Sequence, residues 1–187
     1  MRYKKFLCFE KRELKNDFYP LFLKLRDRGL KIEAYLLMLS TWNIGRFKFV
    51  AYSFNLSKFV KTADQLEMDF KKIEKEDFRK IQLDRYKDVI KKIFRKLRTI
   101  RGVEKTGASK LMHLRLPKVF IMWDSYIRAS YGFGNGDEND YFNFLSKMQE
   151  TFRDFSPCHG RTLAKSIDEH NYNTISKPDL IKARSKK

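Results

Sequence analysis

The residue whose type and position most directly suggest chemistry in this chain is Asp124. It follows a run of five apolar residues, 119–123, and precedes a short helix-like stretch that ends at a glycine. A carboxylate can stabilise positive charge in a transition state, and it can activate water or a lysine. Aspartate is also a favoured helix N-cap, because its oxygen accepts hydrogen bonds from the first backbone N–H groups. Both roles are open from the sequence, and they do not conflict.

A second feature with possible chemistry is the stretch 102–107, which predicts a tight turn between two helices. Gly102 breaks the preceding helix, and Thr106 begins the next one. Backbone N–H groups in such a turn, with the positive end of the following helix, attract phosphate. Contacts of this kind hold a nucleic-acid backbone without reading its sequence. The predicted phosphate contacts are Gly102, Val103, Lys105, Thr106 and Gly107.

The helix before this turn carries positive charge along one face. Its apolar residues between Tyr86 and Ile100 have the three-and-four spacing of an amphipathic helix. The outer face carries a stripe of four basic side chains: Lys87, Lys91, Arg95 and Arg98. We expect this stripe to extend the electrostatic footprint for a polyanion.

The charge balance points to the class of partner. Lys and Arg number 41 against 23 Asp and Glu in 187 residues, a formal net charge of +18. Such an excess favours nucleic acid over an anionic membrane, with a generic basic surface as the plainer alternative. No uncharged apolar run reaches the roughly 18 residues that a membrane span needs. The apolar run near the N-terminus is too short for a signal peptide, so a cytoplasmic location is expected.

The cysteines and histidines suggest no metal or cofactor site. Cys8 and Cys158 are far apart and match no metal-ligand spacing, and a disulfide is not expected in a reducing compartment. His113 is interpreted as structural or as a phosphate donor. His159 and His170 lie too far apart to suggest a metal site. We therefore expect neither metal nor cofactor.

The fold class expected is all-α, a compact bundle of about eight helices containing a helix-hairpin-helix-like element. Only 8 glycines and 4 prolines are present, which favours long helices over short strands and tight turns. One domain is expected over residues 1–176, with two lobes and a cleft as an open alternative, and 177–187 as a frayed basic tail. Helices are predicted at 17–28, 33–41, after a turn at 43–45, after Asn55, from about 75 to 100, at 106–114, 125–131, from 137 or 139 onward, and at 161–170.

The order of these features resembles the helix-hairpin-helix DNA glycosylase superfamily. That family's signature runs roughly Gly-Val-Gly-x-Lys-x-Ala, then a helix, a loop with proline, an apolar run and an essential aspartate. Gly102, Val103 and Ala108 match the first glycine, the valine and the alanine, and Pro117 and Asp124 follow at suitable spacing. The resemblance covers residues 102–132. It implies double-stranded DNA as partner and Asp124 as the catalytic carboxylate.

The chain departs from this signature at two positions. Glu104 replaces the second glycine, and Thr106 stands where some members have a lysine that forms a Schiff base. Lys105 is one residue away from that position, and Lys110 is one helical turn further on. These two lysines are the candidate nucleophiles, and each is otherwise a phosphate contact or a solvated charge. The resemblance thus implies base excision more than strand cleavage.

Excision of a base also requires a pocket for the flipped nucleotide, commonly lined by aromatic rings. The candidates are Trp42, Trp123 and Tyr126, with Tyr52 as a fourth, and packing in the core is the plainer role for each. The patterns together favour a DNA repair glycosylase, acting as a monomer. A non-catalytic helical nucleic-acid-binding protein is the main alternative, and an RNA-associated accessory factor is a third.

Overall fold

The structure is a computed structural model that describes residues 8 and 18–184. This part of the protein is built from helices joined by turns and loops. This described part contains no strand, which confirms the expected all-α class. The helices are α1 (Tyr19–Asp27), α2 (Lys31–Trp42), α3 (Ile44–Phe47), α4 (Leu56–Gln65), α5 (Glu67–Ile73), α6 (Lys87–Arg98), α7 (Glu104–Arg115), α8 (Ser125–Tyr131), α9 (Glu138–Phe152), α10 (Leu163–Asn171) and α11 (Lys177–Arg184). Short 3-10 turns lie at Ala51–Ser53 and Leu83–Tyr86, and a π-helical turn at Tyr172–Ser176 joins α10 to α11.

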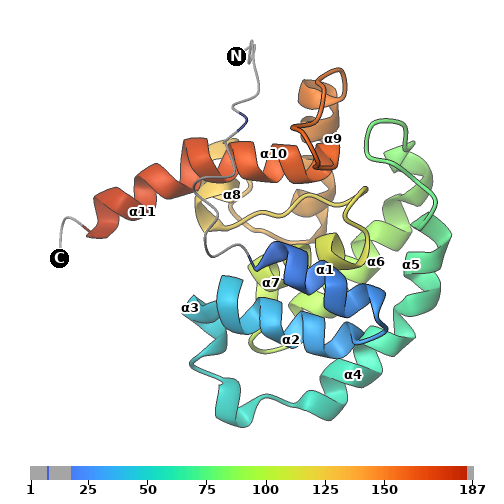
Figure 1. Ribbon diagram of the computed structural model, residues 1–187, viewed down its shortest axis with the longest axis vertical. Helices are drawn as coiled ribbons and strands as arrows, with labels where there is room; N and C mark the ends of the chain where they lie inside the picture. The colour runs from blue at the N-terminus through green and yellow to red at the C-terminus, as the bar shows by residue number, and fades with distance from the viewer. Residues whose placement is uncertain (1–7, 9–17, 185–187) are drawn as a thin grey trace.

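Helix α7 is the central element of this arrangement (Figure 1). The paired helices α1 and α2 pack on it, and so does α6, which also packs against α9. Helices α4 and α5 run around one edge of the molecule, while α10 and α11 form a long rod on the side away from α4. Seven residues of α7 are buried: Gly107, Ala108, Ser109, Leu111, Met112, His113 and Leu114. A helix buried on most of its surface needs neighbours on several sides.

The amphipathic pattern predicted before the turn is confirmed in α6. Its buried residues are Ile90, Ile93, Phe94 and Leu97. Each such side chain contributes about 1.5–3 kcal/mol when fully withdrawn from water. These residues belong to one continuous core cluster that reaches from Tyr19 in α1 to Ile167 in α10.

Several predicted helix ends are confirmed by capping contacts. The Asn55 side chain accepts from Lys58 N at the start of α4, and the Asp137 side chain accepts two N–H bonds at the start of α9. Gly132 ends α8 in the left-handed region at φ 82°, where a side chain would be strained. Polar caps and glycines thus delimit the helices that carry the candidate site.

The prediction of a long helix from about residue 75 is wrong, because α6 begins only at Lys87. Residues 74–82 form turns instead, and three apolar side chains in this region are buried at non-helical spacing: Phe78, Ile81 and Leu83. Phe78 N donates to the carbonyl of Lys118 at 2.8 Å, and the Gln149 amide donates to the Phe78 and Ile81 carbonyls. Burial and these bonds outweigh the helix propensity of the charged residues around them.

Two other segments also differ from expectation. The stretch after Asn43 forms only the four-residue helix α3 before turning into the 3-10 turn at Ala51–Ser53. Residues 177–184, predicted as a frayed tail, form α11, because the helix continues from α10 through the π-helical turn. None of the described helices is long and apolar enough to cross a membrane.

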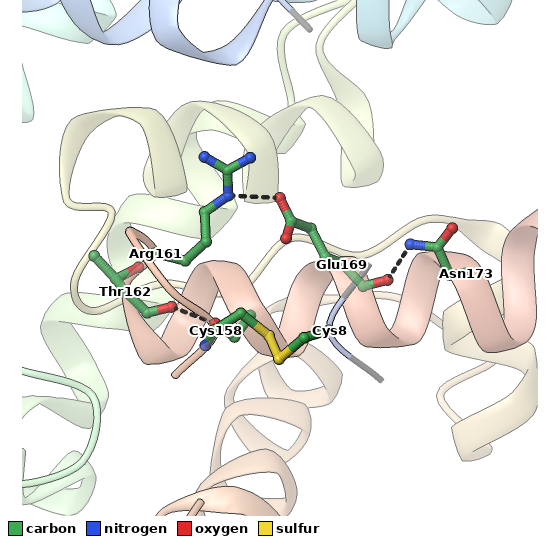
Figure 2. The surroundings of a disulfide bond; sticks show 7 residues. Cys8, Cys158, Arg161, Thr162, Glu169 and Asn173 are labelled. Carbon is green, nitrogen blue, oxygen red and sulfur yellow. Dashed lines mark hydrogen bonds and ion pairs between the residues drawn. A yellow bond between two sulfur atoms is a disulfide. The ribbon is translucent and has the colours of Figure 1, made fainter. Parts of the chain in front are cut away.

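The two cysteines form a disulfide, which the sequence reasoning did not expect. Cys8 is bonded to Cys158, in the loop that precedes α10 (Figure 2). Cys158 N donates to Ser166 Oγ at 2.9 Å, and Arg161 pairs with Glu169 at 3.1 Å beside the bond. The disulfide therefore fixes an N-terminal residue next to α10. Cysteine spacing alone could not show this, since the two residues are 150 positions apart.

Candidate functional site

The predicted turn between α6 and α7 has the backbone of a tight helical hairpin. The Ile100 carbonyl accepts from both Val103 N at 3.0 Å and Glu104 N at 3.1 Å. Gly102 lies at φ 91° and Glu104 at φ 52°. Glu104 has the only positive φ among the non-glycine residues that the structure describes. The residue that replaces the second glycine of the signature thus still adopts a backbone conformation that favours glycine.

The glycines of this hairpin are required by close packing. An added Cβ on Gly102 would lie 2.5 Å from Val50 Cγ2. The Gly102 carbonyl accepts from Asn43 Nδ2 at 3.0 Å, and Gly107 packs against the same asparagine. Gly102, Val103 and Gly107 are all buried. Of the predicted phosphate contacts, only Lys105 and Thr106 keep partly exposed side chains.

Lys105 is held away from the centre of the bundle. Its ammonium donates to the carbonyl of Asn135, at 2.5 Å, in the loop between α8 and α9. Its own carbonyl accepts from Trp123 Nε1 at 3.1 Å. These contacts tie the start of α7 to the apolar run before Asp124. They place Lys105 as a surface cation near the hairpin.

Asp124 is the N-cap of α8, as one of its two predicted roles requires. Its Oδ1 accepts from Tyr126 N and Ile127 N, both at 2.9 Å. Capping by one carboxylate oxygen is compatible with a second role for the other. The side chain is partly exposed, and its charge acts on Lys110 of α7.

Lys110, a candidate nucleophile from the sequence, is the lysine of α7 whose pKa is lowered by burial. Its ammonium donates to the carbonyl of Trp42 at the end of α2. Burial lowers the pKa of Lys110 to about 8, against the opposing effect of the Asp124 and Asp168 carboxylates, while Lys165 lowers it further. An amine with such a pKa is roughly one-tenth neutral at pH 7, and the neutral form is the nucleophile.

A second lysine of the site, Lys165, was not among the residues predicted from the sequence. Lys165 of α10 is 6% exposed, and its ammonium contacts Asp168 Oδ2 at 2.7 Å. The same ammonium lies 4.7 Å from the ring centre of Tyr19 and 5.1 Å from that of Trp42. We refer to Trp42, Lys110, Asp124, Lys165 and Asp168 as the lysine cluster. A lysine between apolar residues, with an acid three positions on, was the signal in the sequence.

His113 has the structural role predicted as one of its alternatives. It is fully buried, with Nδ1 2.6 Å from the Phe120 carbonyl and Nε2 2.8 Å from the Tyr19 hydroxyl. A carbonyl only accepts, so Nδ1 carries the proton and Nε2 accepts from the hydroxyl. Burial lowers the pKa of His113 to about 4, so the ring is neutral at pH 7. It fixes α1 against α7 beneath the lysine cluster.

The three rings predicted to form a base pocket do not come together. Trp123 is 1% exposed and packs in the core against Phe94 and Tyr141, so its ring is a core residue. Trp42 stacks on Tyr19 in the lysine cluster, with ring centres 5.9 Å apart. Tyr126 lines a separate cavity of about 420 Å³ between α8 and the start of α11. The predicted pocket is absent because the apolar run before Asp124 is buried throughout, so that Trp123 packs in the core with other large rings.

The basic stripe of α6 packs along α9 and is partly neutralised there. The ammonium groups of Lys87 and Lys91 each lie 5.5 Å from the ring centre of Phe142. Arg98 pairs with Glu138 at 2.8 Å, and Arg95 approaches the same carboxylate at 3.9 Å. The predicted stripe exists, but its arginines share an acidic partner from the next helix.

Comparison with protein-family models, with curated proteins and with solved structures finds no match to this chain. The resemblance to helix-hairpin-helix glycosylases is therefore carried by the sequence of residues 102–132 alone and stays a prediction. Within the described residues, no three His, Cys, Asp or Glu side chains are grouped to hold a metal ion.

Proposed function

We propose that this protein binds DNA and removes damaged bases as an N-glycosylase, with Asp124 and Lys110 at the reacting centre. The proposal is supported by the place of Lys110 on α7, the helix that begins at the hairpin, where its ammonium donates to the Trp42 carbonyl and the Asp124 carboxylate acts on it. Burial also lowers the pKa of Lys110 to about 8. A lysine with a depressed pKa and a neighbouring carboxylate is a functional-site candidate, because ordinary surface lysines have no such shift. The formal charge of +18 supplies attraction to the DNA backbone.

The chemistry assigned to these residues is cleavage of the bond between C1′ of deoxyribose and the base. The base leaves with the electron pair of that bond and takes up a proton, while positive charge builds on the sugar. The Asp124 carboxylate stabilises that charge. Neutral Lys110 then adds to C1′, or water adds after losing a proton to the carboxylate. Addition of the lysine, with loss of a proton from its nitrogen, gives an aminal. The C1′–O4′ bond of the aminal then breaks as O4′ takes up a proton, which leaves a protonated imine; water hydrolyses this imine and restores the amine.

The experiment is excision from duplexes that carry oxidised, deaminated or alkylated bases, with alkali to reveal abasic sites and borohydride to trap an imine. Asp124→Asn is the informative variant, because asparagine keeps the helix cap and removes the charge. Lys110→Gln tests the amine, and Lys24→Gln, which changes an exposed lysine on α1, is the matched control. Excision and trapping are expected for the wild type and for Lys24→Gln only.

The pH dependence of trapping adds a second readout. The trapped fraction should rise towards pH 8 and then level off, because the pKa of Lys110 is lowered to about 8 by burial. If no lesion is excised, or if Asp124→Asn is as active as the wild type, the catalytic assignment is wrong.

A non-catalytic DNA-binding protein is the second candidate function. It is favoured by the burial of Trp123 in the core, which leaves that ring unavailable to a flipped base. Binding to duplex DNA without excision of any lesion would select this function.

The proposal includes double-stranded DNA as the partner, action as a monomer, and a cytoplasmic location. Binding to DNA should weaken steeply with salt, with a slope of about −0.9 per phosphate contact. A cytoplasmic location requires the Cys8–Cys158 disulfide to persist where disulfides are otherwise rare outside hyperthermophiles.

A further inference from the structure

Two aromatic rings are exposed to solvent on the segment between α2 and α4, residues 43–55. Phe49 is 72% exposed and Tyr52 is fully exposed. An aromatic side chain normally buries about 150–250 Å² of its surface. Two rings that stay exposed on one short segment therefore indicate a surface that a binding partner covers. We call Phe49 and Tyr52 the aromatic platform.

The segment that carries the platform is firmly packed on its inner side. Val50 is only 7% exposed, and it contacts the hairpin at Gly102. The rings of Phe47 and Phe54 meet at 5.1 Å and also cover Gly102. Along the segment, buried or half-buried side chains recur every three or four residues, at Asn43, Phe47, Val50 and Phe54. The platform residues lie between these positions and remain exposed.

The charge around the platform selects a polyanion as its partner. The stretch 44–63 contains four basic residues and no acidic one: Arg46, Lys48, Lys58 and Lys61. The Lys48 ammonium lies 4.8 Å from the ring centre of Phe49, so cation and ring form one surface. Arg46 reaches the hairpin, where its Nε lies 3.6 Å from Glu104 Oε2. A lipid or protein partner would meet the same cations, but only unstacked bases offer flat faces together with phosphates.

We propose that Phe49 and Tyr52 stack on unpaired or unstacked bases of a DNA strand whose phosphates lie on Lys48, Arg46 and the adjoining hairpin. This inference rests on the proposed binding to DNA, and it adds the part of the protein that contacts bases. Stacking on aromatic rings tolerates any base, because every base has a π face. The platform thus favours sites where pairing is already weakened, as at a lesion, a mismatch or a single strand.

The test is binding of oligonucleotides that contain 2-aminopurine, whose fluorescence reports stacking. The probes are a single strand, its perfect duplex and a duplex with a mismatch at the 2-aminopurine. The variant Phe49→Ala/Tyr52→Ala is compared with the wild type and with Met68→Ala, which removes an exposed apolar side chain on α5. Unchanged thermal unfolding shows that the double variant is folded, as expected for exposed side chains.

The expected result is at least tenfold weaker binding of the single strand and the mismatched duplex by the double variant. The fluorescence change should be lost and the salt slope kept, because the rings make no ionic contact. Lys48→Gln should instead lower the salt slope by about one phosphate contact. The control Met68→Ala should bind all three probes, and change their fluorescence, as the wild type does.

Three outcomes would overturn the inference. The double variant could bind the probes as the wild type does, with the same fluorescence change, while excision persists; the proposed function would then stand alone. The rings could instead be needed only for binding to vesicles of anionic lipid, or only for self-association in sedimentation. Conversely, loss of stacking in the double variant without any excision by the wild type supports the platform and refutes the glycosylase.

Discussion

Replacing Glu104 by glycine should make the protein both more stable and a better binder of DNA. Glu104 lies at φ 52°, a conformation that costs a residue with a Cβ about 1–2 kcal/mol. Glycine avoids this cost but loses more chain entropy on folding, about 0.5–1 kcal/mol. The ion pair to Arg46 is largely exposed and contributes little, since exposed pairs are worth about 0–1 kcal/mol. The net gain is therefore about 0.5 kcal/mol, or a Tm higher by about 1–2 °C.

The gain in DNA affinity has a separate cause. A carboxylate at the hairpin repels a bound phosphate by about 1 kcal/mol at contact distance in water, which corresponds to roughly a fivefold weaker complex. The variant Glu104→Gln removes the charge but keeps the strained backbone, so it should gain affinity without gaining stability. Thermal unfolding and fluorescence anisotropy with a labelled duplex measure the two effects independently.

The pair of variants can refute the reasoning at either step. A lower Tm for Glu104→Gly would show that the backbone at 104 is not strained. Equal affinities for the wild type, Glu104→Gly and Glu104→Gln would show that no phosphate approaches the hairpin, and would remove the hairpin from the DNA-binding surface.

Three further predictions concern the scaffold. Gly102→Ala should destabilise the protein by about 2 kcal/mol or more in urea unfolding, since its Cβ would meet Val50 at 2.5 Å at a φ of 91°, whereas Gly45→Ala, with open space around it, should not. The free energy of unfolding should fall by about 3 kcal/mol between pH 6.5 and 4, because His113 has a pKa of about 6.5 in the unfolded chain and burial lowers its pKa to about 4 in the folded protein. Urea unfolding at both pH values measures this fall, and His113→Gln should lack the part of it that is due to this histidine. Reduction of the Cys8–Cys158 disulfide, which spans 150 positions, should lower stability by about 5 kcal/mol by loop entropy, and a dithiothreitol-independent Tm would contradict this.

The sequence predicted the parts of the fold that depend on local patterns. The amphipathic stripe of α6, the N-caps at Asn55, Asp124 and Asp137, and the glycine that ends α8 all depend on residues within a few positions of each other. The irregular path of residues 74–86 could not be predicted in this way, because it depends on bonds to residues that are distant in sequence.

The same distinction applies to the candidate site. Asp124 and Lys110 lie within one motif, so the sequence could single out both as candidates. Lys165 reaches the cluster from α10 through tertiary packing, and the sequence marks it only as a lysine with an acidic residue, Asp168, three positions on. The sequence predicts a base pocket around Trp123, but aromatic rings occur both in cores and in binding pockets, and residue type alone does not distinguish a core ring from a pocket ring.

The bond between Cys8 and Cys158 gives the chain the topology of a closed ring with a tail. Helices α1 to α9 lie inside the ring, and α10 and α11 belong to the tail. A protease that cuts the exposed loop at 134–135 would open the ring once and leave both pieces covalently joined. A cut in the loop after Cys158 would instead release α10, and with it Lys165 and Asp168, from any covalent link to Lys110. A single cut within the ring therefore leaves the lysine cluster on one covalently joined molecule, whereas a cut after Cys158 divides the cluster between two separate chains.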